Sequence, residues 1–332
     1  MRQIDVAPPS EVHARVHGTG VQQRSVTLVK DFPQGSCIAD TDRRRTSGSR
    51  AALCHGDRMV SEIRFEPGLY RGTADYYDRF RLPYPDTMIA DLARRAAPSG
   101  QGRLLDLACG TGQLTFPLHD RFAEVWSVDA EPGMTEVVRA KADASGAAHI
   151  RTITVGAEEL HAEPGGFELI VIGNAFHRLP RALVAQRAHD WLEPGGCLAL
   201  CWSTSPWTGP RNWQRALDGM LRGWQDALGA SCRVPPGWDR ARRQDPDRDV
   251  LARAGLEPAG RHEFSVEHRW TIGELAGHIR STSFLPPSVL VDHAGDFDAG
   301  LTAELGPFAA DGHLTETVGY AYELAHKPAR RP

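Results

Sequence analysis

The chain has 332 residues, of which 41% are hydrophobic and 24% are charged, an ordinary mixture for a globular protein with a sizeable core. Its formal net charge of -4 gives no electrostatic reason to expect nucleic acid or an anionic membrane as a partner. The first residues are polar and do not resemble a signal peptide, and no stretch approaches the roughly 18 apolar residues of a membrane helix, so we expect a cytoplasmic protein.

The first 58 residues differ in composition from the rest of the chain. They contain few aromatic residues and many Arg, Ser, Gly and Pro residues, with a basic run over 43–45. Such a segment can bury little apolar area, so we expect residues 1–58 to form a loosely ordered tail. The basic run could contact RNA or DNA, but a solvated tail is the simpler interpretation. A natural start at Met59 is also left open, and a native N-terminus found at Met1 by mass spectrometry would exclude it.

Helical and strand-like patterns alternate between Pro85 and Trp202. The stretch PDTMIADLARRA carries apolar residues at the spacing of helical turns and predicts the first helix. Five short apolar runs follow, with helical patterns between them. The strands are predicted at 103–109, 124–130, 150–156, 167–173 and 197–202, and the helices at 112–121, 131–144 and 180–192. This order predicts a parallel sheet that is buried under helices on both faces.

The pattern changes after Trp202. Residues 203–258 are rich in Trp, with a helical pattern at their centre and a stretch of Pro, Arg and Asp residues after it. We interpret this segment as a helical lid over an apolar or planar ligand, although Trp residues also anchor dimer interfaces. Beyond it we predict a strand near 260–270, a helix near 271–282 and a last strand near 315–325.

Six cysteines are scattered along the chain without a paired motif, and there is no His-rich cluster. We therefore expect free thiols in a reducing compartment and no metal site. Cys197 and Cys201 lie on a predicted core strand, where they would act as small apolar side chains.

The stretch LLDLACGTGQL, residues 104–114, joins a strand that ends on an acid to a glycine-rich turn. A dinucleotide site would need a third glycine where this chain has Thr115, and a pyrophosphate near Asp106 would be repelled by about 1–4 kcal/mol. A cationic ligand without phosphate fits better, because Gly110 and Gly112 let it approach the backbone and Asp106 attracts it. A glycine turn that binds nothing is the remaining alternative.

This stretch resembles the first motif of the class I S-adenosylmethionine-dependent methyltransferases, an acid followed by Gly-x-Gly. EVWSVDAEPGM resembles the second motif, since it ends a strand on Asp129, 19 residues after Gly110. VGAEELHAEPGGFELIVIGNAFHRL resembles the third block, and ADYYDRFRLPYP resembles a segment that precedes the first motif in small-molecule methyltransferases of the type 11 group. The resemblance covers roughly residues 70–202.

The resemblance implies S-adenosylmethionine as the cofactor. Asp129 would accept hydrogen bonds from the ribose hydroxyls, and Met134 would pack on the adenine, with a plain helix-core role as the alternative for Met134. Ala157 and Glu158 would lie beside the adenine edge, or Glu158 would be an ordinary surface acid.

The methionine end of the cofactor would lie under Tyr77 and Arg81. Arg81 offers a bidentate fork to the ligand carboxylate, and an ordinary surface arginine is the alternative. The expected cofactor-binding residues are Tyr77, Arg81, Asp106, Ala108, Gly110, Gly112, Gln113, Asp129, Ala130, Met134, Ala157, Glu158 and Asn174.

Methyl transfer is an in-line displacement, for which the protein mainly supplies alignment and a dry site. His177 follows the fourth predicted strand and is the best candidate for a general base; a histidine that only packs or hydrogen-bonds is the alternative. Relatives often have an aromatic residue after this histidine, whereas this chain has Arg178, which would favour an acidic acceptor. The block lacks the Asn/Asp-Pro-Pro-aromatic signature of amino methylation of DNA bases. The expected acceptor-binding residues are Phe176, Arg178, Trp207 and Ser283.

We therefore predict an α/β fold with a Rossmann-like, seven-stranded, mostly parallel sheet, an antiparallel last strand, helices on both faces and an inserted helical lid. The predicted parts are the tail (1–58), an N-terminal cap with the S-adenosylmethionine-binding core (59–202), the lid (203–258), and the rest of the sheet with an acceptor-pocket helix (259–332). The expected activity is methylation of a small molecule at O, N or C, in secondary metabolism, by a monomer or homodimer.

Two other functions are left open by the sequence. An enzyme of this fold can also cyclise or cleave the aminobutyl arm of S-adenosylmethionine, or use the bound cofactor to steer a rearrangement. A binding or regulatory protein with a vestigial site is the third reading. Methylthioadenosine formed without an acceptor would favour the non-methylating enzyme, and a lack of affinity for the cofactor would favour the binding or regulatory protein.

Overall fold

The computed structural model of the chain describes residues 65, 66 and 68–329. The tail expected over 1–58 and the alternative start at Met59 lie outside the described residues.

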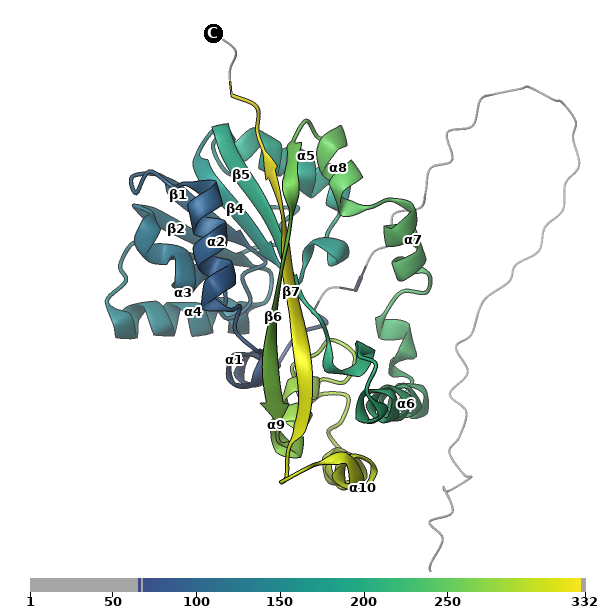
Figure 1. Cartoon of the computed structure of the whole chain (residues 1–332). Helices are drawn as coiled ribbons and strands as arrows, with labels where there is room; N and C mark the ends of the chain where they lie inside the picture. Colours follow the sequence, from purple (N-terminus) through teal and green to yellow (C-terminus); the bar gives the residue numbers. More distant parts are fainter. Residues whose placement is uncertain (1–64, 67, 330–332) are drawn as a thin grey trace, which may run out of the picture. The chain divides into compact units, whose positions relative to one another are not determined.

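Seven strands form one sheet in the order β3-β2-β1-β4-β5-β7-β6 (Figure 1). Strands β1 to β5 are parallel to one another, whereas β7 is antiparallel to both of its neighbours, β5 and β6. The strands are β1 (Arg103–Leu107), β2 (Glu124–Asp129), β3 (Ile150–Thr154), β4 (Phe167–Gly173), β5 (Leu192–Ser203), β6 (Glu257–Trp270) and β7 (Leu314–His326). The predicted seven-stranded, mostly parallel sheet with an antiparallel last strand is confirmed.

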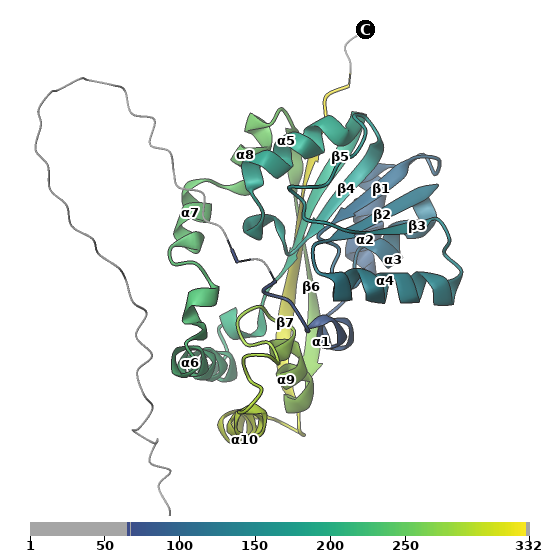
Figure 2. The ribbon, with the colours of Figure 1, turned by 180° about the vertical axis from the view of Figure 1, so that it is seen from behind.

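Helices cover both faces of this sheet because its central strands are apolar on both sides. Successive residues of a strand point to opposite faces, so Leu104 packs in one core cluster and Leu105 in another. The first cluster contains residues of α2 (Asp86–Ala96), α3 (Thr115–Leu118) and α4 (Pro132–Ser145), and the second contains residues of α5 (Arg181–Trp191) and α8 (Asp247–Arg253). Figures 1 and 2 show these layers from opposite sides.

A group of helices, here called the cap, lies where β6 and β7 extend past the parallel strands (Figure 1). It consists of α6 (Asn212–Ala227), α9 (Ile272–Arg280) and α10 (Ala294–Leu305), which form a third core with the ends of β6 and β7. Trp213 and Trp224 of α6 pack in this core. The helix α1 (Ala74–Phe80) contacts α9, and α7 (Trp238–Gln244) lies between α6 and α8 in the chain. Much of the Trp-rich segment therefore builds a hydrophobic core of its own.

A buried carboxylate joins the cap to the sheet. Glu316 on β7 is 3% exposed and accepts hydrogen bonds from Trp270 Nε1 at 2.6 Å and from Gln214 Nε2 at 2.8 Å. Burial raises the pKa of Glu316, and the two N–H donors oppose this shift. Since Trp270 ends β6 and Gln214 lies in the first turn of α6, these bonds tie the cap to the sheet.

Most of the predicted elements are confirmed to within a few residues, and the exceptions have physical reasons. The helix predicted over 112–121 is wrong at its start, because Gly112 has a φ of 90° and α3 begins only at Thr115. The strand predicted at 197–202 begins earlier, at Leu192. We did not predict α1, α7 or α10; α10 contains Gly295 and Gly300, and two glycines make a weak helical pattern.

Four cysteines lie in the described part of the chain and are free thiols, as expected, whereas Cys37 and Cys54 lie outside it. In the same part of the chain, no helix has both the length and the apolar character that a membrane span requires.

The contact between α1 and α9 gives a stability test with a matched control. A Cβ atom on Gly277 of α9 would lie 2.5 Å from the ring of Phe80, whereas Gly273 in the same helix has open space. We expect Gly277→Ala to lower the free energy of unfolding by about 1–3 kcal/mol, because the overlap pushes α1 away. Gly273→Ala should raise it by up to about 1 kcal/mol, since alanine favours the helix. Thermal or urea unfolding measures both; equal effects of the two substitutions would contradict the packing described.

Candidate active site

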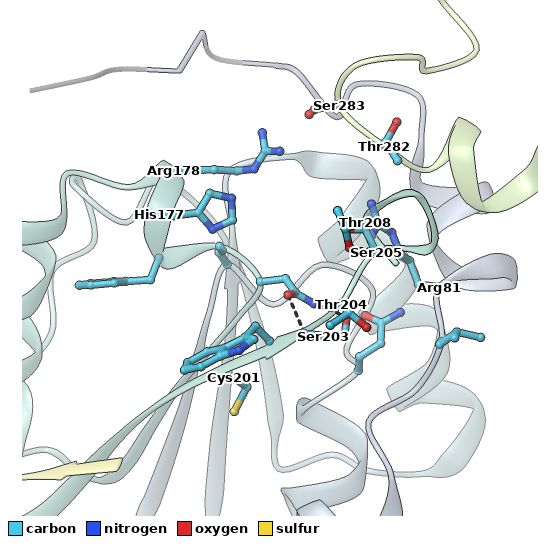
Figure 3. A pocket seen from close by; sticks show the side chains of 18 of the residues that line it. Arg81, His177, Arg178, Cys201, Ser203, Thr204, Ser205, Thr208, Thr282 and Ser283 are labelled. Carbon is cyan, nitrogen blue, oxygen red and sulfur yellow. Dashed lines mark hydrogen bonds between the residues drawn. The ribbon is translucent and has the colours of Figure 1, made fainter. Parts of the chain in front are cut away.

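A cavity of about 750 Å³ lies between the C-terminal ends of the central strands and the cap (Figure 3). Asp106 on β1, Asn174 just after β4 and Ser203 at the end of β5 line it from the sheet. Trp207 and Phe284, which pack against the third core, line it from the other side. Parallel strands present their carboxyl ends at one edge, so residues far apart in sequence meet in one site.

The turn after β1 follows a backbone path that favours glycine. Gly110 has a φ of 55° and Gly112 a φ of 90°. A Cβ atom on Gly110 would lie 3.1 Å from the ring of Tyr77, which therefore covers bare backbone at this point. Ala108 has a φ of 58° although it carries a Cβ atom; such strain costs about 1–3 kcal/mol and concentrates at ligand sites.

Asp106 is the buried acid of this turn. It is 1% exposed, lines the cavity and accepts a hydrogen bond of 2.7 Å from Thr115 Oγ1, which lies 2.9 Å from Ser127 Oγ. Burial raises the pKa of Asp106 to about 7, and its hydrogen bonds from Thr115 oppose the shift. A positive charge bound in the cavity would favour the ionised form.

Asp129, at the end of β2, holds the same turn from the neighbouring strand. Its Oδ2 accepts a hydrogen bond of 2.9 Å from the Gly110 N–H, and its Oδ1 accepts one of 2.9 Å from the Glu131 N–H. Burial raises the pKa of Asp129, and these backbone donors oppose the shift. Each carboxylate oxygen accepts more than one hydrogen bond, so Asp129 keeps capacity for two hydroxyl donors.

Tyr77 and Arg81 come from α1 and the residue that ends it. The Arg81 guanidinium lies 4.9 Å from the centre of the Tyr77 ring, and its Nη2 donates a hydrogen bond of 3.2 Å to the carbonyl of Ser281. Its Nε is buried and has no hydrogen-bond partner among the described residues. Burial raises the pKa of Tyr77 to about 12, so this hydroxyl stays neutral at pH 7. An acceptor on a ligand would satisfy the free N–H of Arg81.

Asn174 connects β4 to β5 at the edge of the cavity. Its carboxamide donates to Tyr84 Oη and to Ser203 Oγ, both at 3.2 Å, and accepts a bond of 3.1 Å from the Ser203 N–H. Its φ of 51° is again in the left-handed region. Two of the four non-glycine residues with positive φ in the described chain, Ala108 and Asn174, therefore line this cavity.

His177 lies on the one-turn helix η2 (Phe176–Arg178), with its ring against Trp238 at 5.3 Å between centres. Burial lowers the pKa of His177 to about 3, and the positive charges of Arg178, Arg242 and Arg181 act in the same direction. The imidazole is therefore neutral at pH 7, and burial together with these charges makes it a weak base.

The expected site residues divide into two groups. All the expected acceptor residues and His177 line the cavity, together with six of the expected cofactor-binding residues, Tyr77, Arg81, Asp106, Ala108, Gln113 and Asn174. The other seven do not line it: Gly110, Gly112, Asp129, Ala130, Met134, Ala157 and Glu158. In this second group Met134 and Ala157 are buried, and Glu158 is exposed. Their assignment to the adenosine half of a ligand stays a prediction.

Several cavity residues were not singled out from the sequence. Phe65 and Tyr70 precede the type 11-like segment and lie against Arg178. Their position just before Tyr77, in a stretch rich in aromatic and arginine residues, is a signal that could have been used. Glu316 carries no such signal, because an acid on a strand of alternating polar residues is usually exposed.

The polar groups of the site favour a ligand that carries a positive and a negative charge but no phosphate. Asp106 offers a buried carboxyl to a cation, Arg81 offers a free buried N–H to a carboxylate, and Asp129 offers acceptors to hydroxyls. The ring of Tyr77 lies against Gly110 and the ring of Phe116 against Gly112, so the turn has no room for larger side chains. These features fit an amino-acid end joined to a nucleoside.

The comparisons with known proteins agree with this chemistry. The methyltransferase domain family matches residues 104–196. A ubiquinone biosynthesis O-methyltransferase of Ruegeria pomeroyi is 30% identical over 181 residues, which are 52% of this chain and 68% of the relative. An uncharacterized methyltransferase of Mycobacterium bovis is 33% identical over 130 residues, 39% of this chain and 49% of the relative. The chain therefore spans only about half the length of that relative.

Among solved structures, a candidate type II methyltransferase of Anaeromyxobacter dehalogenans has the same fold, with a TM-score of 0.54. It is 16% identical and matches 75% of this chain and 98% of its own.

The raised pKa of Asp106 predicts how this residue affects stability in the ligand-free protein. The carboxyl titrates near 7 when folded and near 3.8 when unfolded, so the wild-type protein loses stability as the pH rises through this interval. Asp106→Asn cannot ionise, and we expect it to be more stable than the wild type by about 1–4 kcal/mol at pH 8 and not at pH 4. Unfolding at the two pH values measures this. The control is Asp143→Asn, at an exposed position of α4. If the wild type were more stable than Asp106→Asn at pH 8, burial would not destabilise the ionised form of Asp106.

Proposed function

Because the chain belongs to the class I S-adenosylmethionine-dependent methyltransferases, we propose that it methylates a small-molecule acceptor in secondary metabolism. The observation that carries the proposal is the buried, cavity-facing carboxyl of Asp106 beside a glycine turn. S-adenosylmethionine, when bound, supplies a methyl group activated by a sulfonium charge. One relative, the Ruegeria protein, is named for O-methylation in ubiquinone biosynthesis, which supports a small-molecule hydroxyl as the acceptor group.

Each end of the cofactor would meet a group of matching charge. Asp106 would attract the positive charges of the methionine end, and Arg81 would bind its carboxylate through the N–H that has no partner among the described residues. Asp129 would accept the ribose hydroxyls while it holds the Gly110 N–H. Tyr77 lies over the glycine turn, so it would exclude water from this end of the site.

The acceptor would occupy the part of the cavity between Phe176, His177 and the cap. Trp207 and Trp238 line the cavity, which supports the lid hypothesis for part of the segment 203–258, whereas Trp213 and Trp224 belong to the third core. Trp202, which also lines the cavity, lies on β5 before this segment. The aromatic lining favours a planar, largely apolar acceptor.

His177 would accept the proton of an acceptor hydroxyl. Its pKa of about 3 in the ligand-free protein is low for this role. A negative charge on the acceptor would offset the field of the neighbouring arginines and raise this pKa. Loss of the hydroxyl proton then accompanies attack of the oxygen on the methyl carbon.

A second candidate function follows from the same weak base. If His177 accepts no proton, the site could bind S-adenosylmethionine for cleavage or cyclisation of its aminobutyl arm, or for an assisted rearrangement. None of these reactions needs an acceptor hydroxyl. Cleavage or cyclisation would give methylthioadenosine from enzyme and cofactor alone, whereas an assisted rearrangement would leave the cofactor intact.

The test uses S-adenosylmethionine with a tritiated methyl group, the purified chain, and a panel of aromatic acceptors with hydroxyl and carboxyl groups. We expect label to appear in an acceptor and S-adenosylhomocysteine to form in equal amount. His177→Gln should lower kcat by about 10²–10⁴ without weakening S-adenosylhomocysteine binding, because the base acts on the acceptor.

Two outcomes would count against this account. Methylthioadenosine formed without an acceptor would favour the second function. Full turnover in His177→Gln would leave His177 as a packing residue and would remove it from the proposal.

A further inference from the structure

The guanidinium of Arg178 lies in the cavity with an incomplete set of partners. Its Cζ is 4.8 Å from the centre of the Phe65 ring and 5.3 Å from the centre of the Tyr70 ring. Its Nε and Nη1 are buried, and neither has a hydrogen-bond partner among the described residues. Two aromatic rings stabilise the charge of a guanidinium, but they leave its N–H donors unsatisfied. A ligand with acceptor atoms would satisfy them.

Arg222 and Arg242, which also line the cavity, differ from Arg178 because they are already paired with acids. Arg242 donates to Asp247 at 2.6 and 3.0 Å, and Arg222 lies 2.5 Å from Asp218. Within the described chain, no carboxylate lies within salt-bridge distance of Arg178. Arg178 therefore contributes about one uncompensated positive charge to this part of the cavity.

A second polar group without a partner lies on the loop after α9. The Oγ of Ser283 is buried, lines the cavity and has no hydrogen-bond partner among the described residues. Figure 3 shows Arg178 and Ser283 at the same end of the cavity, on opposite sides. Arg233 holds the two sides together, since it donates hydrogen bonds to the carbonyls of Ser283 at 2.6 Å and Leu69 at 3.1 Å. Leu69 precedes Tyr70, one of the two rings on Arg178.

We propose that the methyl acceptor is an aromatic carboxylate whose carboxylate group is bound by Arg178, with Ser283 as a further donor. A guanidinium binds a carboxylate through charge-assisted hydrogen bonds, and the free Nε and Nη1 of Arg178 can each donate one; because they lie on different edges of the guanidinium, each would donate a single bond. The inference rests on the proposed function, because it names the acceptor of that reaction.

The charge of the site distinguishes a carboxylate from a phosphate. The one positive charge of Arg178 balances the single charge of a carboxylate, whereas a phosphate dianion would keep a second, unbalanced charge in a cavity that the buried acids Asp106 and Glu316 also line. The aromatic rings of Phe65, His177 and Trp238 lie against one another beside Arg178, and they offer an aromatic, largely apolar surface to the rest of the acceptor.

The carboxylate of the cofactor is the competing occupant of Arg178. Tyr70 and Tyr77 form a pair of rings 6.2 Å apart, with Arg178 on Tyr70 and Arg81 on Tyr77. The ring of Tyr77 contacts both Gly110 of the glycine turn and the guanidinium of Arg81. Arg178 contacts Tyr70 instead, so it lies farther from the glycine turn than Arg81 does. Arg81 is therefore the better partner for the amino-acid end of the cofactor.

Carboxylate binding would also act on the base. Arg178 is one of the charges that depress the pKa of His177. Arg242 and Arg181 are the other two, and both are paired with acids. Burial is the main cause of the low pKa of His177, and an acceptor carboxylate on Arg178 would offset only the part that this charge adds, which shifts the pKa upward.

The experiment measures the binding of matched probes by calorimetry in the presence of saturating S-adenosylhomocysteine. The probes are benzoate and 2-naphthoate, the two corresponding carboxamides, and phenyl phosphate. We expect at least one carboxylate to bind about 10-fold or more tightly than its carboxamide, as a charge-assisted pair would give. In Arg178→Gln this ratio should fall to about 1–3, and Arg178→Lys should restore part of it.

Two controls separate binding from folding. Arg222→Gln removes an arginine that also lines the cavity but is paired with Asp218, and it should leave the ratio unchanged. S-adenosylhomocysteine should bind Arg178→Gln with an affinity within about 2-fold of wild type, which also shows that the variant is folded.

The possible results are distinct. Equal affinities for all carboxylates and carboxamides, a ratio that survives in Arg178→Gln, or tighter binding of phenyl phosphate would each overturn the inference. Weaker S-adenosylhomocysteine binding in Arg178→Gln alone would assign this arginine to the cofactor instead. A wild-type protein that does not bind S-adenosylhomocysteine would remove the proposed function, and the inference with it.

Discussion

The burial of one carboxyl group, that of Asp106, constrains the whole site. A desolvated carboxylate is unstable in the interior of a protein unless donors or a cation compensate it. In this chain the compensation within the protein is partial: Thr115 donates a hydrogen bond, yet burial still raises the pKa of Asp106 to about 7. The fold keeps the acid near the end of a strand whose last four residues are buried, where a bound cation would complete its environment. The strained backbone of Ala108, in the turn that follows, is a second unfavourable feature of this site. The rigid sheet around the turn tolerates both the strained backbone and the buried carboxyl.

The cap closes the other side of the cavity. Hydrophobic packing stabilises the cap, and a few buried polar contacts fix its position on the sheet. The third core of the cap supplies its stability, with Trp213 and Phe297 fully inside it. Glu316 sets the position of the cap on the sheet through Trp270 and Gln214. The contact of α1 with α9 then brings Arg81 to the cavity, where its Nη2 binds the carbonyl of Ser281. Positive charge is thus available at two places for two carboxylates, Arg81 for the cofactor and Arg178 for the acceptor.

The parts of this structure that follow local rules could be predicted from the sequence. Apolar runs and turn residues gave the strands, and the acid and glycines of residues 106–112 gave the ligand turn, because these depend on residues close together in the chain. The environment of Arg178 could not be predicted in this way. Its neighbours Phe65 and Tyr70 lie more than a hundred residues earlier, and only the folded chain brings their rings to the guanidinium. The cap has the same difficulty, since α10 has a weak helical pattern and is stabilised by packing through Phe297 and Leu301.

In the ligand-free protein the carboxyl of Asp106 is buried with a raised pKa, and a cationic ligand would stabilise its ionised form. Calorimetry of S-adenosylmethionine binding at pH 6, in two buffers with different enthalpies of ionisation, measures the protons released on binding. Because Asp106 is largely protonated at this pH and the ligand favours its ionised form, the account predicts release of up to about one proton by the wild type and clearly less by Asp106→Asn. Equal proton release by the two proteins, with equal affinity, would contradict the account.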